Sequence, residues 1–435
     1  MKLAWASPFN LQSAIGRVSA DVTRALAEAG HQLTLIATED EPPTALHATP
    51  APVRHWRTVD LDELFQSVDG VFVNIGDHYL YHAGVFGLLG KGPCVGIFHD
   101  FYLHNLFLGW LAAHRFGPEV HDREIVGCYG ESQRAVAQAA REGRLSLEEF
   151  ANVLPMTEWM ARRCAGAVAH SPFYAPRLES ACPGPVGLAR LPVTGRGVTA
   201  LPPRAGREVI ALTVGVMNPN KCVDRVIDAI GASESLRSRL RYRLVGPISE
   251  SEAARLTRLA SDLGVVGLEV HGAVDDSTLV EHLAAADIIA CLRDPVLEGA
   301  SASAIEGLLA GRPVLVADAG FYRHIPAEMA VKTPAPVRAE DIRIRLEQLI
   351  DDEPGRRALG ARARAWAEDQ FTVEAYARVL SDVLQAAAAA APLQRVGRNL
   401  GFELAALGLA PEDPSVERIG RVLTEIFPTE FSTPP

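Results

Sequence analysis

The feature that most constrains the fold is a unit in the C-terminal half of the chain. Residues 286–292 form a short apolar run of the kind found in a strand buried on both faces of a parallel sheet. Residues 303–310 have a helix-forming composition that ends at Gly311, and residues 313–317 are predicted as the next strand. Because loops at the C-terminal ends of parallel strands bind ligands, we expect a functional site between the first strand and the helix.

Two carboxylates bracket a run of small residues at this expected site. Glu298 lies in the loop and Glu306 in the first turns of the helix, with Gly299, Ala300 and Ser301 between them. On one helix the two glutamates would be about 12 Å and about 80° apart. That exceeds the spacing of about 5 to 10 Å for carboxylates that share one reaction centre. Small residues allow close backbone approach and a helix N-terminus attracts anions, so the pattern indicates a long ligand with an anionic middle, such as a nucleotide sugar.

The two glutamates also resemble a family signature. Their spacing is similar to the Glu-x7-Glu element of retaining glycosyltransferases of family 4, which have the GT-B fold. The flanking strand, the small residues and the Gly-Arg-Pro at 311–313 strengthen the resemblance. It implies that Glu298 bonds hydroxyls of the donor sugar and that Glu306 bonds the ribose. Gly299, Ala300 and Ser301 would belong to the same donor site.

Two elements in the N-terminal half fit this resemblance. Residues 94–98 are predicted as a strand that ends in His99 and Asp100, where the loops of this fold face the interdomain cleft. The resemblance places His99 beside the donor sugar and phosphate; a histidine that only caps the strand end is the alternative. Gly16 and Arg17 begin a predicted helix and resemble the family's glycine loop, whose amides face the donor diphosphate near the acceptor. Helix–strand packing is the alternative role of Gly16.

The second half of the chain restarts the strand-helix pattern. Residues 209–214 are predicted as a strand and 223–231 as a helix, with Gly215 before the intervening turn and Asn220 and Lys221 at its end. A lysine at the mouth of a helix can reach an anion held by the helix amides. The segment resembles the Gly-x5-Lys element of family 4, whose lysine contacts the donor diphosphate.

One position departs from the family pattern. Val216 stands where the family often carries arginine directly after the glycine. Neutralisation of a diphosphate would then depend on Lys221 and backbone amides, with help from Arg225 or Arg293. In the family, loops after the next strands hold the nucleobase. The resemblance therefore makes residues 245–248, which include Gly246, and residues 271–274 the candidates here.

The length of 435 residues favours two domains with an appended tail. We predict an α/β protein of the GT-B class, with two Rossmann-like doubly wound domains facing across a cleft. The expected parts are an acceptor domain at 1–185, a linker rich in Gly, Pro and Arg at 186–207, a donor domain at 208–370, and a helix with a helical tail at 371–435. The family resemblance implies that this helix crosses back to the N-terminal domain.

Three boundaries within these parts are also predicted. Residues 153–164 are expected to be helical, and residues 165–171 to form the last strand of the N-terminal domain. The crossing helix, which starts at 371, is expected to end at Pro392 because proline interrupts a helix interior.

Composition limits the classes of function. A hydrophobic content of 48%, a charged content of 22% and a net charge of −11 are typical of a globular enzyme and argue against nucleic-acid binding. The six cysteines are scattered without a C-x-x-C pair, which favours buried thiols in a reducing cytoplasm. We find no signal peptide or membrane-spanning run and expect a cytoplasmic protein, with the inner face of the membrane as a second location.

Two segments leave alternatives open. The aromatic run at 101–111 could line an acceptor pocket or touch lipid, although buried core is the commoner use of such a stripe. The tail carries Arg395, Arg398, Arg418 and Arg421 on otherwise apolar helical patterns, which fit either a partner surface or, as we favour, a cover for the domain beneath.

The leading hypothesis is transfer of a sugar from a UDP- or GDP-sugar to a hydroxyl of a glycan, glycolipid or small metabolite. The predicted catalytic residues are His99, Asp100, Lys221 and Glu298. No D-x-D element stands in a plausible loop, so we expect neither a metal nor another cofactor. A nucleotide-sugar 2-epimerase of similar fold and a non-catalytic sugar-nucleotide-binding module are the rival hypotheses. The base, the donor sugar, the acceptor and the oligomeric state are left open.

Overall fold

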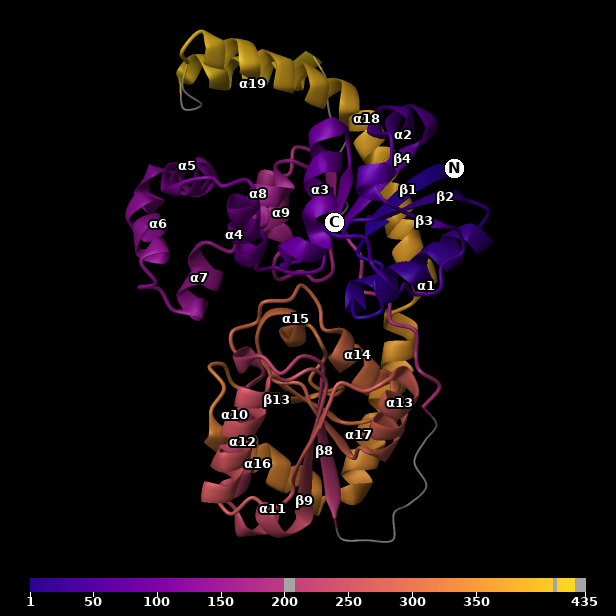
Figure 1. The fold of residues 1–435 in the computed structure, drawn as a ribbon, viewed down its shortest axis with the longest axis vertical. Coiled ribbons are helices and arrows are strands. Elements are labelled where there is room, and N and C mark those ends of the chain that lie inside the picture. Colours follow the sequence, from indigo (N-terminus) through magenta and orange to yellow (C-terminus); the bar gives the residue numbers. More distant parts are fainter. Residues whose placement is uncertain (199–207, 410–412, 427–435) are drawn as a thin grey trace.

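The computed structural model describes residues 1–198, 208–409 and 413–426. It consists of two α/β domains, one above the other in Figure 1, each built on a parallel sheet with helices against its faces. A long helix near the C-terminus runs from the lower domain back to the upper one. This is the GT-B architecture that the sequence predicted.

The N-terminal domain is organised around a seven-stranded sheet with the order β3-β2-β1-β4-β5-β6-β7. Every pairing in it is parallel, and the central strands are short apolar runs buried on both faces. The strands are β1 (Lys2–Ser7), β2 (Gln32–Ala37), β3 (Val53–His55), β4 (Gly70–Ile75), β5 (Val95–Phe98), β6 (Gly166–Ala169) and β7 (Val186–Leu188).

Helices fill the connections that parallel strands require. In this domain they are α1 (Ala14–Glu28), η1 (Trp56–Thr58), α2 (Leu61–Ser67), α3 (Tyr79–Lys91), α4 (His104–Ala113), α5 (Pro118–Tyr129), η2 (Glu131–Gln133), α6 (Arg134–Arg141), α7 (Leu147–Val153), α8 (Thr157–Ala161) and α9 (Ala175–Ala181). The helices α4 to α7 form a lobe to one side of the sheet (Figure 1).

The C-terminal domain has a six-stranded parallel sheet with the order β10-β9-β8-β11-β12-β13. Its strands are β8 (Val209–Val214), β9 (Leu240–Val245), β10 (Leu268–Gly272), β11 (Ile288–Ala290), β12 (Val314–Ala317) and β13 (Val331–Thr333). Its helices are η3 (Pro219–Lys221), α10 (Val223–Gly231), α11 (Glu234–Arg239), α12 (Glu250–Asp262), α13 (Asp276–Ala285), α14 (Ala302–Leu309), α15 (Gly320–Arg323), α16 (Ala339–Asp351) and α17 (Glu353–Gln370). The helix α18 (Val373–Ala406) and the helix α19 (Pro414–Ile426) follow.

The central unit of the sequence folds as predicted. The strand β11 is followed by a loop, by α14 and by β12, and α14 begins one residue earlier than expected. Ser301 accepts the N–H of Ala304 and so caps the helix, while Gly311 adopts a φ of 69° just after it ends. The helix α10 begins and ends at the predicted residues.

The prediction of one helix over residues 153–164 was wrong. The helix α7 ends at Val153, α8 spans only residues 157–161, and between them Met156 lies in the left-handed region with a φ of 64°. Pro155 explains the break because it disfavours the helical conformation at Leu154 and lacks an N–H for the helix ladder.

Residues 165–171 contain the strand β6, as predicted, but β6 is not the last strand of the domain. The strand β7 pairs in parallel with β6, and Ala189 and Leu191 beyond it are buried. The first residues of the predicted linker therefore belong to the N-terminal sheet. A three-residue edge strand is too short to show a hydrophobic period. Residues 199–207 of the predicted linker lie outside the described residues.

The prediction that the crossing helix ends at Pro392 was wrong. The helix α18 includes Pro392 and continues to Ala406. Alanine on the N-terminal side of the proline strongly favours helix, and a proline ring already has a helical φ. Beyond the proline, the Gln394 side chain donates to the Ala165 carbonyl at 3.0 Å, which fixes the continued helix to the N-terminal domain.

The helix α18 crosses back to the N-terminal domain as expected (Figure 1). Tyr376, Leu380 and Val383 on it are buried among side chains of both domains. Gly187 of β7 permits this contact, because a Cβ there would lie 2.3 Å from Val383 Cγ2. The helix therefore ties the two domains together.

Two other segments can now be placed. In the aromatic run, Phe101, Leu106 and Phe107 are buried core residues, which was the favoured reading, whereas Leu108 is 44% exposed. In the tail, Phe402 and Leu407 are 70% and 76% exposed, so these apolar side chains do not cover the domain beneath, contrary to the role that we favoured. Residues 410–412 and 427–435 of the tail lie outside the described residues. Among the described helices, none is both long and apolar enough to cross a bilayer.

Candidate active site between the two domains

The loop that carries Glu298 is bonded directly to the N-terminal domain. Asp100 and Glu298 form an antiparallel bridge. The N–H of Gly299 donates to the His99 carbonyl at 2.8 Å, and the Ser171 hydroxyl donates to the Gly299 carbonyl at 2.7 Å. The sequence predicted these two loops as parts of one site, and the backbone brings them together across the domain boundary.

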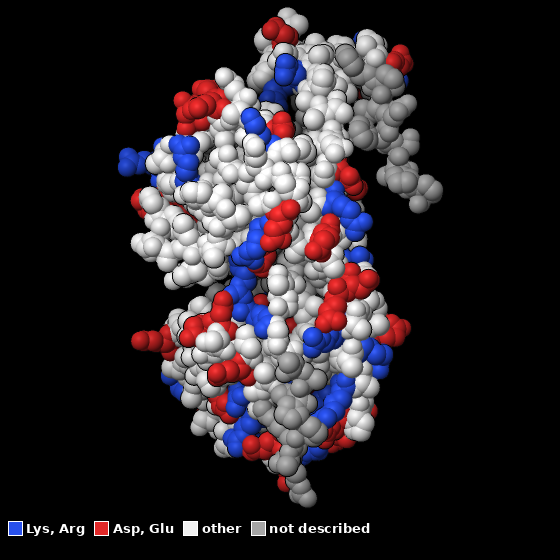
Figure 2. Space-filling view, turned by 90° about the vertical axis from the view of Figure 1, so that its right-hand side faces the viewer, with Lys and Arg blue, Asp and Glu red and all other residues white. Residues whose placement is uncertain are grey.

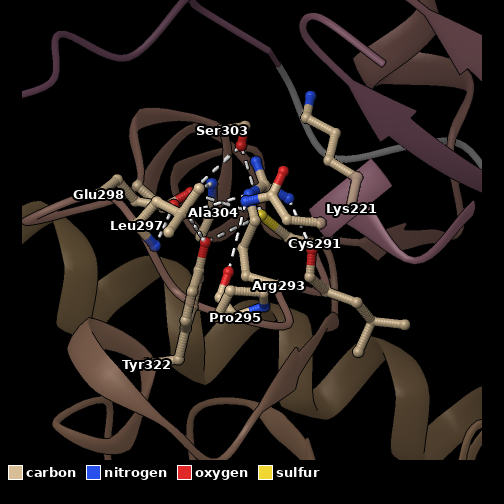
Figure 3. Close-up of polar contacts among 12 residues, drawn as sticks. Lys221, Cys291, Arg293, Pro295, Leu297, Glu298, Ser303, Ala304 and Tyr322 are labelled. Carbon is tan, nitrogen blue, oxygen red and sulfur yellow. Dashed lines mark hydrogen bonds and ion pairs between the residues drawn. The ribbon is translucent and has the colours of Figure 1, made fainter. Parts of the chain in front are cut away.

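Glu298 lies beside a buried arginine (Figure 3). Arg293 Nε is 3.0 Å from Glu298 Oε1, and the Tyr322 hydroxyl donates a short hydrogen bond to the same oxygen. Although burial lowers the pKa of Arg293, the nearby Tyr322 and Glu298 outweigh it and raise that pKa, so the guanidinium stays charged. The Glu298 side chain is 17% exposed. This pairing orients one carboxylate oxygen toward the protein.

Lys221 extends from the turn before α10 toward the end of β8. Its Nζ donates to the Val214 carbonyl at 2.5 Å. A Cβ added to Gly215 would lie 2.8 Å from this Nζ, so glycine leaves room for the lysine. Burial, followed by the positive charge of Arg293, lowers the pKa of Lys221 to about 7. An anion brought to this turn would meet a lysine whose charge depends on pH in the neutral range.

Two glycines predicted for the donor site lie against each other. Gly215 has a φ of 95° and Gly246 a φ of 141°. A Cβ on Gly246 would be 2.4 Å from the Gly215 carbonyl oxygen. This contact between the ends of β8 and β9 requires glycine at 246, and the positive φ of Gly215 favours glycine there. Local structure therefore accounts for both residues without a ligand.

Asn220 supports the loop that leads to Glu298. Its backbone carbonyl accepts the N–H of Asp294 at 2.8 Å, and its side chain donates to the Pro295 carbonyl at 3.4 Å. Arg225 pairs with Asp294 and donates to the Val337 carbonyl at 2.8 Å. Arg225 and Arg293 were suggested to replace the arginine that the family carries at the position of Val216. Arg225 is bonded to this loop, whereas Arg293 lies beside Glu298.

The start of α14 lies next to this cluster. Ala300 and Ser301 are buried, and the Cys291 sulfur is 3.4 Å from the Ser301 hydroxyl and 3.3 Å from the Ser303 hydroxyl. The small side chains thus pack the helix start against the end of β11, as the sequence pattern suggested.

Glu306 belongs to a second cluster of charges. Arg196 Nε donates to Glu306 Oε1 at 2.8 Å, and Arg17 Nη1 is 3.9 Å from the same oxygen. Asp276 pairs with both arginines, at 3.0 Å from Arg196. Figure 2, which views the molecule from this side, shows basic and acidic side chains alternating across the waist between the domains. Arg17 thereby links the N-terminal domain to the C-terminal one.

Glu306 and Arg196 also line a cavity of about 330 Å³, together with Leu283, Arg364 and Phe371. Neither Lys221 nor Glu298 lines this cavity. The predicted site residues therefore form two groups at opposite ends of the 298–306 segment.

Gly16 has a packing role in the structure. The helix α1 begins at Ala14, so Gly16 lies inside its first turn, and the Gly16 N–H donates to the Ser13 hydroxyl at 3.0 Å. A Cβ on Gly16 would be 2.4 Å from the Pro8 carbonyl oxygen. The side chain of the neighbouring Arg17 reaches the charge cluster around Glu306.

His99 and Asp100 have different surroundings. His99 is buried, and burial, followed by the neighbouring His170 and His82, lowers its pKa well below the usual value. Asp100 accepts the N–H of Asp77 at 2.9 Å. Burial and the charge of Glu298 raise the pKa of Asp100 to about 7.

Several residues of this region were not predicted from the sequence. Asn74, Asp77 and Arg196 each contact a predicted site residue. They come from segments far from the motifs, so spacing could not identify them. Their place in the fold could have indicated two of them. Asn74 lies near the C-terminal end of β4 and Asp77 just after it, where this fold places ligands.

Among the described residues, no group of three or more His, Cys, Asp or Glu side chains could hold a metal ion. Lys221 and Arg293 are cationic groups near Glu298, and Arg17 and Arg196 lie beside Glu306.

The fold and the two domain-bridging clusters define a GT-B protein, and known proteins agree with this class. Residues 202–366, well under half of the chain, match the model of a family described as "Glycosyl transferases group 1". No curated protein sequence matches the chain.

Solved structures resemble most of the chain. Sucrose-phosphate synthase from Thermosynechococcus elongatus is 15% identical with a TM-score of 0.61, over 88% of this chain and 98% of that one. HepE from Anabaena, in complex with UDP and glucose, is 14% identical with a TM-score of 0.59, over 88% and 99%. WaaG, a glycosyltransferase involved in lipopolysaccharide biosynthesis, is 17% identical with a TM-score of 0.56, over 88% and 99%. These similarities establish the fold and, with the family match, support sugar transfer as the class of reaction.

Proposed function

We propose that the chain is a retaining glycosyltransferase that moves a sugar from a nucleoside diphosphate to an acceptor hydroxyl without a metal ion. The observation that carries this proposal is the bridge between Glu298 of the donor domain and Asp100 of the N-terminal domain. The bridge joins the loop of Glu298, which pairs with the buried Arg293, to the His99 loop at the interdomain boundary, and this supports a sugar site there.

The chemistry explains why these groups suit the reaction. Breaking the anomeric C–O bond builds negative charge on the leaving diphosphate and positive charge on the sugar ring. Lys221, Arg293 and the amides at the start of α10 and α14 would stabilise the diphosphate, and in other enzymes one such donor lowers the barrier by about 3 to 4 kcal/mol. The phosphate would accept the proton of the acceptor hydroxyl.

Glu298 would bind hydroxyls of the donor sugar and is not assigned as a nucleophile. Arg293 and Tyr322 bond its Oε1, and within the described residues the hydrogen bond of Oε2 is a long one of 3.4 Å from the Leu297 N–H. That oxygen can accept a hydroxyl of the sugar. Glu306 would bind the ribose at the other end of the ligand. HepE, which has a similar fold, is known in complex with UDP and glucose, and this supports a nucleotide-sugar donor.

The first experiment is a binding screen. Thermal stability is measured with UDP, GDP, ADP and dTDP, because a ligand that binds the folded state stabilises it by mass action. The nucleotide that binds is then tested as its sugar conjugate, with and without a panel of hydroxylated acceptors, and the anomeric configuration of the product is determined by NMR.

The outcomes separate the rival functions. A glycoside with retained configuration supports the proposal, and inverted configuration contradicts the retaining mechanism. An isomerised donor in the absence of acceptor identifies an epimerase. Binding without turnover, in the presence of the full acceptor panel, favours a binding module. No stabilisation by any of the nucleotides would contradict the proposed function as a whole.

A further inference from the structure

The orientation of the His99 ring is fixed by Asn74, which is the second-last residue of β4 and is 1% exposed. The side-chain amide of Asn74 donates from Nδ2 to the Ala6 carbonyl at 3.0 Å. Its oxygen Oδ1 therefore faces His99 Nε2, at 2.8 Å. The reverse orientation of the amide would set its oxygen against the Ala6 carbonyl, where neither group could donate.

This contact determines where the proton of His99 lies. A carboxamide oxygen only accepts, so Nε2 carries the hydrogen, and a neutral imidazole then has its lone pair on Nδ1. Burial lowers the pKa of His99 well below its ordinary value, so the ring stays neutral at physiological pH. No hydrogen bond joins Nδ1 to another residue in the described part of the chain.

The neighbouring histidine reinforces this state. The rings of His99 and His170 have centroids 4.8 Å apart, and His170 Nδ1 bonds the Ala189 carbonyl at 3.0 Å. A carbonyl also only accepts, so His170 carries its proton on Nδ1 and keeps a lone pair on Nε2. Burial lowers the pKa of His170 to about 4, so a second neutral ring lies beside His99.

We propose that Asn74 is a positioning residue for the transfer reaction, holding His99 as the Nε2–H tautomer so that Nδ1 can accept a hydrogen bond from a hydroxyl of the donor sugar. This inference rests on the proposed function. The backbone supports it, because the His99 carbonyl is bonded to Gly299 and the adjacent Asp100 bridges Glu298. The histidine is thus part of the same boundary that holds the sugar-binding carboxylate.

The first test needs no enzymatic activity. The full chain is labelled with ¹⁵N-histidine, and the ring nitrogens of His99 are assigned by comparison with His99→Gln. We expect the pattern of a neutral Nε2–H ring throughout roughly pH 6 to 8, the range in which an unperturbed histidine titrates. A proton on Nδ1, or titration within this range, would overturn the proposal.

The second test asks whether the lone pair meets the sugar. Addition of the nucleotide sugar identified by the binding screen should shift the His99 Nδ1 resonance, whereas the matching nucleoside diphosphate should leave it nearly unchanged. An equal shift with both ligands would contradict a contact with the sugar. If no sugar nucleotide binds at all, the proposed function fails, and the tautomer found in the free protein still reports on Asn74.

The third test uses Asn74→Asp, which keeps the acceptor and adds a charge. A carboxylate beside imidazole favours the imidazolium and typically shifts a pKa by about 1 to 3 units. The acid limb of the kcat profile should therefore move to higher pH, with nucleoside diphosphate affinity unchanged. Asn152→Asp makes the same chemical change at an exposed position of the same domain and should leave the profile unaltered.

A purely structural role for Asn74 would lower the stability of Asn74→Asp without moving the pH profile, and that result would overturn the proposal. Should this variant not fold, the ring-nitrogen spectra of the unaltered chain decide the tautomer, and the response of Nδ1 to the sugar decides the contact.

Discussion

Arg196 holds Glu306 by a hydrogen bond of 2.8 Å from its Nε, and the two side chains are only 12% and 11% exposed. Glu306 is the residue proposed to bind the ribose of the donor. In the described structure its carboxylate is therefore already bonded to a cation from the segment between the domains. Arg17, which approaches within 3.9 Å, adds a contact from the N-terminal domain. A nucleotide that uses Glu306 has to compete with these arginines.

Arg196→Ala should therefore bind nucleoside diphosphate more tightly. Removal of one competing hydrogen bond to a charged group is worth about 1.5 kcal/mol, which corresponds to about a tenfold lower Kd. Calorimetric titration measures this change, and its dependence on salt should be weaker than in the unaltered chain. Glu306→Gln is the matched variant and should weaken binding. Weaker binding by Arg196→Ala would instead mean that Arg196 orients Glu306 for the ribose.

Binding of a diphosphate should become weaker as pH rises above neutrality. The pKa of Lys221 is lowered by burial to about 7, and an adjacent anion favours the charged form, so binding at pH 8 should take up a proton. Affinity should fall by up to about tenfold per pH unit between roughly pH 7 and 9. Proton uptake is measured by calorimetry in buffers of different ionisation enthalpy. Lys221→Arg should bind without uptake, and a pH-independent affinity of the unaltered chain would place Lys221 outside the donor site.

The lowered pKa of Lys221 should make the free chain more stable as pH rises, whereas it makes diphosphate binding weaker. Between about pH 7 and the ordinary value of 10.5, the unfolded chain binds a proton at Lys221 that the folded chain does not. The free energy of unfolding contributed by Lys221 therefore rises with pH across this window.

Asp100→Asn should stabilise the protein more at pH 8 than at pH 5. Burial, and secondarily the charge of Glu298, raise the pKa of Asp100 from 3.8 to about 7. Its contribution to stability is fully present below the ordinary value and is lost as pH rises through about 7. Since Asp100 is partly exposed, we expect a difference of about 1 kcal/mol between the two pH values.

Urea unfolding of both proteins at each pH measures this difference. Asp262→Asn, which removes one carboxylate from an exposed surface, is the matched control. A stability gain that is the same at both pH values would show that Asp100 does not carry the shifted proton.

Glu298→Gln should lose both stability and activity, for separable reasons. The change leaves the buried Arg293 without its carboxylate, and loss of one partner of a buried ion pair costs about 3 to 5 kcal/mol. The double variant Glu298→Gln with Arg293→Met removes the unpaired charge as well and should recover much of the stability but no activity. Thermal unfolding and turnover of the three proteins measure the two effects. Recovered turnover in the double variant would contradict a direct role of Glu298 and Arg293 in catalysis.

Removal of residues 397–435 should leave the two domains intact. Phe402, Leu407 and Val422 in the described part of this segment are largely exposed, so little apolar burial is lost. The cut also retains Gln394 and its bond to the Ala165 carbonyl. We expect a Tm within about 2 °C of the full chain, since 1 kcal/mol shifts Tm by about 2 to 4 °C in proteins of 150 to 250 residues. A much larger drop, or loss of nucleotide binding, would show that the tail supports the domains.

The sequence by itself determined the order of the elements. The apolar run at 209–214 is a strand and the run at 286–292 contains the strand β11. The Lys221 turn precedes a helix, and Glu298 lies in a loop with Glu306 on the helix after it. These features are local: strand burial, helix caps and glycine stops depend on a few neighbouring residues. Where a local rule was outweighed, as at Pro392, contacts to the other domain and a helix-forming neighbourhood decided the result.

Only the tertiary structure decided which side chains meet. The pairing of Arg196 with Glu306, of Arg293 with Glu298 and of Asn74 with His99 joins residues 110, 5 and 25 positions apart, respectively, and none of these pairs forms a motif. Whether two polar groups bond depends on which strands are neighbours in the sheet and how the two domains pack. For this reason the sequence could name the acidic, basic and imidazole groups of the site, whereas their protonation and their partners followed from burial across the domain boundary.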